Sequence, residues 1–313
     1  MTMKKKFKFS DFMKGLMFSL AIGTGTLFFF EKGNKKQNYT RLLKQKIPFE
    51  NINQRSGINH EKENFLTDSD KVLLARMLFG EARGCSYEEK LAIGEVVIYR
   101  CLSPNFLNTV KEVILMPGAF KCFDKKDPNI DEVLDPRTHN PEEWENCLVI
   151  AEKILQQIKN IDAGKNPGLS IPVAYYYRDS RAQKLAEPYL EVTTVGRFTF
   201  YVTRIDRISP HFKVSEFMCK DYCRHFILDI GLVLKLERLR ELTGPIYITS
   251  GYRCPNHNSK VSGVQESQHT LGKAADIVVK GLTPAQMTQF AERVGFGGIG
   301  TYTKKGFIHV DIR

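Results

Sequence analysis

The sequence predicts an α+β protein with two domains, a mixed and mostly helical one at 67–204 and a small one with an antiparallel sheet at 205–313. A membrane segment precedes them. The chain of 313 residues is long enough for two domains of ordinary size. Along it, helical periodicity gives way to stretches rich in β-branched and aromatic residues. The stretch 204–212, which contains Pro210, has the composition of a junction between domains.

The N-terminus has the order of an export signal. A lysine cluster precedes an uncharged run from Gly15 to Phe30, and further charges come after the run. Phenylalanines end the run where a cleavage site requires small residues. Residues 1–36 are therefore predicted to be an uncleaved membrane anchor, with both domains outside the cytoplasm in the periplasm or cell wall. A cleaved signal, which gives a secreted protein, and a weakly apolar anchor that later leaves the membrane are the alternatives.

Residues 37–66 are polar and lack an apolar period, so they are predicted to form a linker. The formal net charge of +11 predicts attraction to anionic envelope polymers. No basic run is interleaved with stacking aromatic residues, so nucleic acid is not a predicted partner.

Caps, prolines and periodicity place the elements of both domains. In the first domain these are a helix from the caps at 67–69 to Gly84, helices Tyr87–Leu102 and Pro141–Lys159, and strands Ile171–Tyr177 and Leu190–Val202. In the second they are helix Leu228–Leu242, strands Ile246–Thr249 and Ala274–Val279, a helix from Thr283 to Val294, and a hairpin of Ile299–Tyr302 and Phe307–Ile312 around the turn Thr303–Gly306.

The chain has seven cysteines, and an odd count leaves at least one unpaired. Cys219-x3-Cys223 has the spacing of half a zinc site. No second cysteine pair or closely spaced histidine pair completes it in the sequence. A disulfide or a buried thiol is therefore the favoured interpretation.

A second group of residues has the chemistry of a catalytic metal site. His269 lies on a predicted loop, Asp276 near the start of a predicted strand, and His309 on the last strand. Two imidazoles and one carboxylate, with a fourth position open for water, are ligands that catalytic zinc uses to hydrolyse amides. Alternation along the last strand puts Asp311 on the same face as His309, where it is predicted to orient a ligand or handle a proton.

The motif Ser-x-His-x6-Asp at 267–276, the segment Ser250–Pro255 and the terminal His-Val-Asp are similar to the D-alanyl-D-alanine carboxypeptidase and endopeptidase family M15. The similarity covers nearly all of residues 211–313. It implies that His269, Asp276 and His309 are the zinc ligands.

The resemblance further implies that Arg253 binds a substrate carboxylate or stabilises the charge that develops on the attacked carbonyl. It places Ser267 in the substrate-binding set. Many members of the wider family carry an acidic general base three residues before the last histidine, and here that position is Gly306. This departure leaves Asp311 as the candidate for proton transfer.

In the first domain, Glu81 ends an apolar helix next to Phe79. A partly desolvated carboxyl has a raised pKa and can act as an acid near neutral pH. Taken alone, a glutamate in this position is more often a solvated surface group.

Four blocks of the first domain resemble the spore-cortex-lytic and cell-wall hydrolase family typified by SleB. They are Leu74–Gly84, Ala92–Arg100, Val113–Phe123 and Val195–Tyr201. The resemblance spans about 66–204 and implies that Glu81 protonates the glycosidic oxygen.

Ordinary glycosidases need two carboxylates, and these blocks show no obvious second one. One glutamate suits a lytic transglycosylase, in which the sugar's own 6-hydroxyl attacks; a glycosidase is the alternative. The chain departs from the family where it has Tyr99 in place of Asn, Ala119 in place of Gln, and Ala174-Tyr175 in place of a Thr-His pair.

Both resemblances point to peptidoglycan, one to its glycan strands and the other to its peptides. The sequence therefore predicts a bifunctional peptidoglycan-degrading enzyme with zinc as cofactor. The alternatives are a zinc peptidase with an inactive, wall-targeting first domain, and a non-catalytic zinc-containing wall-binding protein.

Overall fold

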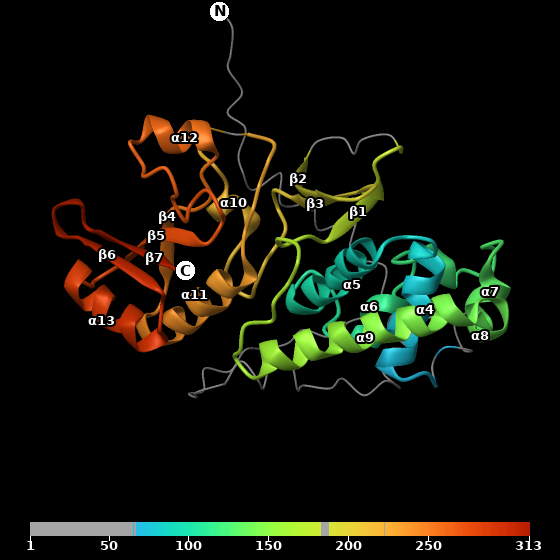
Figure 1. Ribbon diagram of the computed structural model, residues 1–313. Helices are drawn as coiled ribbons and strands as arrows, with labels where there is room; N and C mark the ends of the chain where they lie inside the picture. Colours follow the sequence, from blue (N-terminus) through green and yellow to red (C-terminus); the bar gives the residue numbers. More distant parts are fainter. Residues whose placement is uncertain (1–64, 66, 183–187, 222) are drawn as a thin grey trace, which may run out of the picture. The chain divides into compact units, whose positions relative to one another are not determined.

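The computed structural model describes residues 65, 67–182, 188–221 and 223–313 (Figure 1). The predicted anchor, and all of the predicted linker except Phe65, lie outside this part of the chain. Within it, no helix has both the length and the apolar character needed to cross a membrane. The predicted α+β class is confirmed, with helices first and antiparallel sheets after them.

The N-terminal part of the described chain is mostly helical. Its helices are α4 (Asp70–Ala82), α5 (Tyr87–Leu102), α6 (Val110–Leu115), η2 (Lys121–Phe123), α7 (Ile130–Leu134), α8 (Pro136–His139) and α9 (Pro141–Asp162). The long helix α9 packs against α4 and α5. Helix α5 has its predicted bounds because Ser86 and Glu89 form a capping box, with backbone-to-side-chain hydrogen bonds of 2.8 and 3.2 Å.

A three-stranded antiparallel sheet comes next, in the order β1-β3-β2. Its strands are β1 (Tyr176–Asp179), β2 (Tyr189–Val195) and β3 (Phe198–Thr203). The prediction of one strand over Leu190–Val202 is wrong, because Gly196 has a φ of 52° and turns the chain into a hairpin.

The predicted strand at Ile171–Tyr177 begins too early. Pro172 has no N–H to donate, and the amide of Val173 bonds to the carbonyl of Leu228 rather than to a neighbouring strand. Ile171, Val173 and Ala174 are buried ahead of the sheet, which the segment joins only from the Tyr175 amide onward. Their composition therefore reflects burial.

The C-terminal part contains helices α10 (Val214–Phe217), α11 (Ile230–Thr243), α12 (Pro255–Lys260) and α13 (Pro284–Val294). Its strands are β4 (Ile246–Ser250), β5 (Ala274–Val279), β6 (Gly298–Tyr302) and β7 (Phe307–Asp311). They form an antiparallel sheet in the order β4-β5-β7-β6, and helices α11 and α13 pack against it. Helix α13 starts where predicted because Thr283 and Gln286 form a capping box.

The hairpin between β6 and β7 is the predicted one, with the short helix η3 (Thr303–Lys305) in its turn. Gly306 closes the turn with a φ of 76°, a conformation that residues with a Cβ rarely adopt. The position three residues before His309 is therefore a turn position that favours glycine over a carboxylate.

Strand pairing places residues of the predicted metal site side by side. Asp276 on β5 lies directly opposite His309 on β7. Ser250, at the end of β4, lies opposite Asp276 on the other side. The sheet register thus fixes the separation of two predicted ligands and directs the chain after β4 toward them.

Glu95 of α5 fixes the loop that leads to β1. Its side chain is fully buried and accepts hydrogen bonds from the Ser170 amide and hydroxyl, the Ile171 amide and Gln157 Nε2, over 2.7–3.1 Å. Burial raises the pKa of the Glu95 carboxyl, and the hydrogen bonds from Ser170 and Gln157 oppose the rise. The loop is thereby held to α5.

We expect Glu95→Gln to lower the free energy of unfolding by about 1–3 kcal/mol, because an amide NH2 then faces N–H donors. Urea denaturation of the full chain measures this. Glu152→Gln is the matched control, since Glu152 forms an exposed ion pair with Lys71 at 3.2 Å. Such a pair is worth less than about 1 kcal/mol. Equal stabilities of the two variants would contradict the role of Glu95.

Candidate functional site

Three donor atoms meet on the C-terminal sheet. His269 Nε2 lies 3.2 Å from Asp276 Oδ1 and 3.1 Å from His309 Nδ1. His309 Nδ1 lies 3.1 Å from Asp276 Oδ1. Ligands about 2.0–2.1 Å from a tetrahedral zinc ion are about 3.3 Å from one another. The spacing and the chemistry of this His/Asp/His set therefore fit zinc.

Outer hydrogen bonds select which nitrogen of each histidine is available. His269 Nδ1 lies 2.7 Å from the carbonyl oxygen of Gly251, which can only accept a hydrogen bond. His309 Nε2 lies 3.2 Å from Asp311 Oδ2. With a metal ion bound, each ring would therefore carry its proton on the outer nitrogen and turn the lone pair of the other nitrogen toward the ion, an arrangement typical of metal-binding histidines.

Gly251 can hold His269 because the chain passes very close to Phe217. A Cβ built on Gly251 would lie 2.5 Å from the Cα and 2.6 Å from the carbonyl oxygen of Phe217. The next amide, of Tyr252, donates to that same carbonyl at 2.8 Å. Glycine is thus required by close backbone approach.

Arg253 lies beside the metal-type centre. Its Nη2 donates to Asp276 Oδ2, and its Nε donates to Ser250 Oγ at 2.9 Å. Burial disfavours the charged form of Asp276, but the contacts with His269 and Arg253 outweigh it and hold the pKa of this carboxyl below its usual range. Asp276 is therefore ionised at neutral pH, as a metal ligand must be.

Asp311 is 0% exposed, and both of its oxygens have partners. Arg313 Nε donates to Oδ1 at 2.9 Å, and Oδ2 lies beside His309. Burial opposes ionisation of Asp311, but the bonds from Arg313 and His309 prevail and lower the pKa of its carboxyl to about 2. Of the two roles that the sequence left open, orienting a ligand and handling a proton, this position favours orienting His309.

Ser267 is buried, and its carbonyl and hydroxyl take part in the turn that carries His269. Its carbonyl accepts from Thr270 Oγ1 at 2.7 Å, and its hydroxyl accepts from the His269 amide at 3.4 Å. This places Ser267 under the ligand loop, so the predicted substrate contact stays a prediction.

Glu81 is half-buried near the end of α4 and touches two groups from other elements. The amide of Cys122 donates to Oε1 at 3.1 Å, and the hydroxyl of Tyr177 donates to Oε2 at 3.1 Å. Burial raises the pKa of the Tyr177 hydroxyl well above its usual value, and the nearby Glu81 adds to the rise. Tyr177 therefore stays a hydrogen-bond donor over the ordinary pH range.

Sequence reasoning did not identify Tyr177 or Gly251. Tyr177 is 96 residues from Glu81, and nothing in its local pattern distinguishes it from neighbouring aromatic residues. The residues that depart from the cell-wall hydrolase pattern include Tyr99, Ala174 and Tyr175, and all three are buried in the core. Their side chains pack the domain interior.

A His/Asp/His centre on an antiparallel sheet and, separately, a half-buried glutamate held by two donors are the two candidate sites, and both are of kinds that hydrolytic enzymes use. Comparisons with known proteins agree. Residues 210–311 match the family described as Peptidase M15, and residues 84–201 match the family described as Cell Wall Hydrolase. Both resemblances seen in the sequence are thereby confirmed for these regions.

Individual relatives match parts of the chain. Peptidoglycan L,D-endopeptidase MepK of Escherichia coli (strain K12) is 31% identical over 109 residues, which cover 32% of this chain and 59% of the relative. The spore cortex-lytic enzyme of Bacillus subtilis (strain 168) is 46% identical over 54 residues, 17% of this chain and 18% of the relative. The chain thus spans less than two thirds of either protein.

Among solved structures, the catalytic domain of the germination-specific lytic transglycosylase SleB from Bacillus anthracis is 22% identical, with a TM-score of 0.29. The match covers 44% of this chain and 98% of that one.

We expect Asp311→Asn to weaken zinc binding about 10- to 100-fold, because the neutral amide orients His309 less firmly and lowers its basicity. Competition of metal-stripped protein with a chelating dye measures the affinity. Asp131→Asn, which changes an exposed carboxylate on α7, is the control. Unchanged affinity in the Asp311 variant would show that this carboxylate does not support the ligand.

Proposed function

We propose that the chain is a bifunctional peptidoglycan-degrading enzyme that cuts stem or cross-link peptides at one site and glycan strands at the other. The observation that carries the proposal is the meeting of His269, Asp276 and His309 within 3.2 Å, in a region that matches a peptidase family. The second region matches a cell-wall hydrolase family, and the relatives of the two regions include a peptidoglycan endopeptidase and a spore cortex-lytic enzyme, which supports one wall polymer as the shared substrate.

At the peptide site, His269, Asp276 and His309 would hold zinc, which supplies a Lewis acid and a water of lowered pKa when bound. The chain's own residues do the remaining work. Arg253 neutralises Asp276 and brings a cation next to the position where charge develops on the attacked carbonyl. Asp311 keeps the proton of His309 on Nε2. The name of the MepK relative makes a bond between an L- and a D-residue the first substrate to test.

At the glycan site, Glu81 acts as the single acid and base of a lytic transglycosylase. Its carboxyl gives a proton to the glycosidic oxygen as the bond to the muramic acid C1 breaks. The 6-hydroxyl of the same sugar bonds to C1 and returns its proton to Glu81, so no water is consumed. The Tyr177 hydroxyl and Cys122 amide both stabilise the carboxylate that exists between these transfers.

The predicted anchor gives the location of this activity. We propose that residues 1–36 hold the protein in the membrane with both domains outside the cytoplasm, where peptidoglycan lies. Cell fractionation with protease protection tests the topology, and release of a shortened chain would instead identify a cleaved signal.

His269→Ala is expected to reduce the release of new amino groups from peptidoglycan to background, because the metal loses a ligand. Labelling of free amines after digestion by the full chain measures this, and Glu81→Gln should leave it intact. No amine release by the wild-type protein would favour the alternative of a wall-binding protein.

Glu81→Gln is expected to slow glycan cleavage about 10²- to 10⁴-fold, as removal of a general acid does. Tyr177→Phe should slow it about tenfold, because one hydrogen bond to a charged group is lost. Mass spectrometry of the fragments counts 1,6-anhydromuramic ends, and His269→Ala serves as the folded control. Reducing ends in place of anhydro ends would identify a glycosidase, and no ends of either kind would make the first domain a targeting module.

A further inference from the structure

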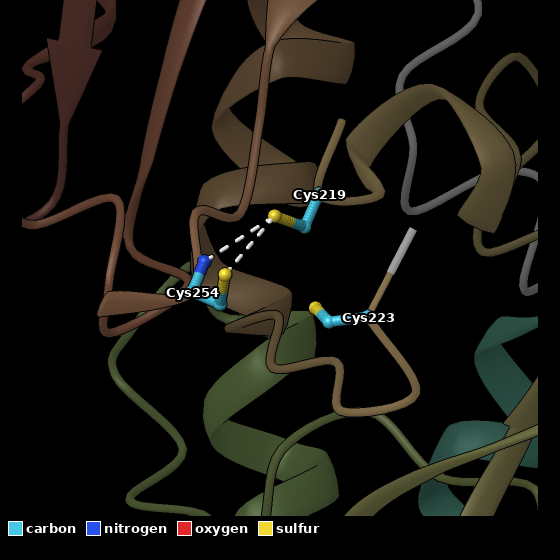
Figure 2. Close-up of side chains that lie close together, drawn as sticks. All are labelled: Cys219, Cys223 and Cys254. Carbon is cyan, nitrogen blue, oxygen red and sulfur yellow. Dashed lines mark hydrogen bonds between the residues drawn. The ribbon is translucent and has the colours of Figure 1, made fainter. Parts of the chain in front are cut away.

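Three cysteines gather at a second place in the C-terminal part. Cys219 lies just after α10, Cys223 comes four residues later, and Cys254 is the N-cap of α12. Figure 2 shows their sulfur atoms turned toward one another, and all three lie within 4.8 Å of each other. His257, in the first turn of α12, adds a ring nitrogen beside Cys219.

The distances fit a metal better than a disulfide. The sulfurs of Cys219 and Cys254 are 3.6 Å apart, and His257 Nδ1 lies 3.4 Å from the Cys219 sulfur. A disulfide joins sulfurs at about 2.05 Å. In a tetrahedral site with zinc–sulfur bonds of about 2.3 Å, two sulfurs lie about 3.8 Å apart, and a sulfur and a nitrogen about 3.5 Å.

Backbone N–H groups point at two of the sulfurs. The Cys254 amide donates to the Cys219 sulfur at 3.4 Å, and the His257 amide donates to the Cys254 sulfur at 3.4 Å. Hydrogen bonds to sulfur favour the thiolate, which is the form that binds metal. All seven cysteines lie in the described part of the chain and none is in a disulfide, and a single Cys219–Cys254 disulfide would leave Cys223 beside it without a role.

We infer that Cys219, Cys223 and Cys254 bind a structural zinc ion. His257 lies beside Cys219 but outside the group of mutually close donor atoms, and a small shift of its ring would supply the fourth ligand. Each thiol gives up its proton to solvent as its sulfur binds the ion. The spacing Cys-x3-Cys and Cys-x2-His is of the kind that closed zinc sites use. The site is distinct from the His269 centre in its ligands, because it draws none from β5 or β7.

This ion would tie the segment that follows α10 to the segment 251–257 beside the peptide site. Cys219 lies two residues after Phe217, whose backbone packs on Gly251, and Cys254 directly follows Arg253. The ion pair between Lys260 and Asp221, at 2.9 Å, also joins these segments, but Lys260 is exposed and such a pair adds little stability. The zinc would therefore hold the segment 251–254 that supports His269 and Asp276.

Metal analysis of the full chain, purified with zinc and a thiol reductant, tests the inference. We expect about two zinc ions per chain in the wild type and about one in Cys223→Ser, Cys254→Ser or His269→Ala. His257→Ala should bind its second zinc more weakly, and Cys101→Ser, which alters a half-buried cysteine of α5, should keep both. Cobalt replacement should give a sulfur-to-cobalt charge-transfer band in the wild type and in His269→Ala but not in Cys223→Ser.

Two results would overturn the inference. One is a wild-type protein with a single zinc and a Cys219–Cys254 disulfide, found by mass spectrometry of the unreduced chain. The other is a cobalt spectrum of His269→Ala without the sulfur band. Since His269→Ala leaves every cysteine in place, this measurement decides the question even if the cysteine variants fail to fold.

Discussion

The pairing of β5 with β7 is the constraint on which the peptide site depends. It sets Asp276 opposite His309, and a slip of one residue would turn one of these side chains to the other face of the sheet. Strand β7 is paired on both sides, since β6 also aligns Gly300 with His309. The remaining parts of the site adapt to this fixed pair. The loop supplies His269, the end of β4 leads into the carbonyl that orients it, and the last strand supplies Asp311.

Local sequence signals were sufficient to predict the helices and strands whose first and last residues carry a clear start or stop signal. Helix α5 and helix α13 begin at capping boxes, and β5 has the bounds that its β-branched run indicates. Prediction failed where burial imitates a strand, as at Ile171–Tyr177, and where a tight turn lies within a continuous β-rich stretch, as at Gly196. The helices of four to six residues were not predicted, because such a segment is too short to show a helical period.

The site residues also fall into two groups, those that a local sequence signal predicts and those that only the folded structure brings into contact. The proposed zinc ligands were predicted because each residue type stands in a motif with a fixed spacing. Glu81 was predicted because its block resembles the cell-wall hydrolase family, since its place at the end of an apolar helix alone indicates a surface group more often. Tyr177, Gly251 and His257 act through contacts that the chain makes only after folding, over separations that carry no local pattern. Gly306 shows the reverse case: the missing carboxylate and the turn at Thr303–Gly306 were both visible in the sequence, but the left-handed backbone conformation of Gly306 was not.

Gly251 orients His269, a proposed metal ligand, through its backbone carbonyl, and this has a consequence for mutation. Glycine has no side chain that could react or bind. A Cβ added at this position would nevertheless collide with Phe217 and displace the carbonyl that holds His269. In a library that samples every amino acid along the chain, this position should tolerate as few replacements as a ligand does. Intolerance to mutation at this position would reflect the lack of room for a Cβ. It would affect reactivity only because the displaced carbonyl no longer holds His269.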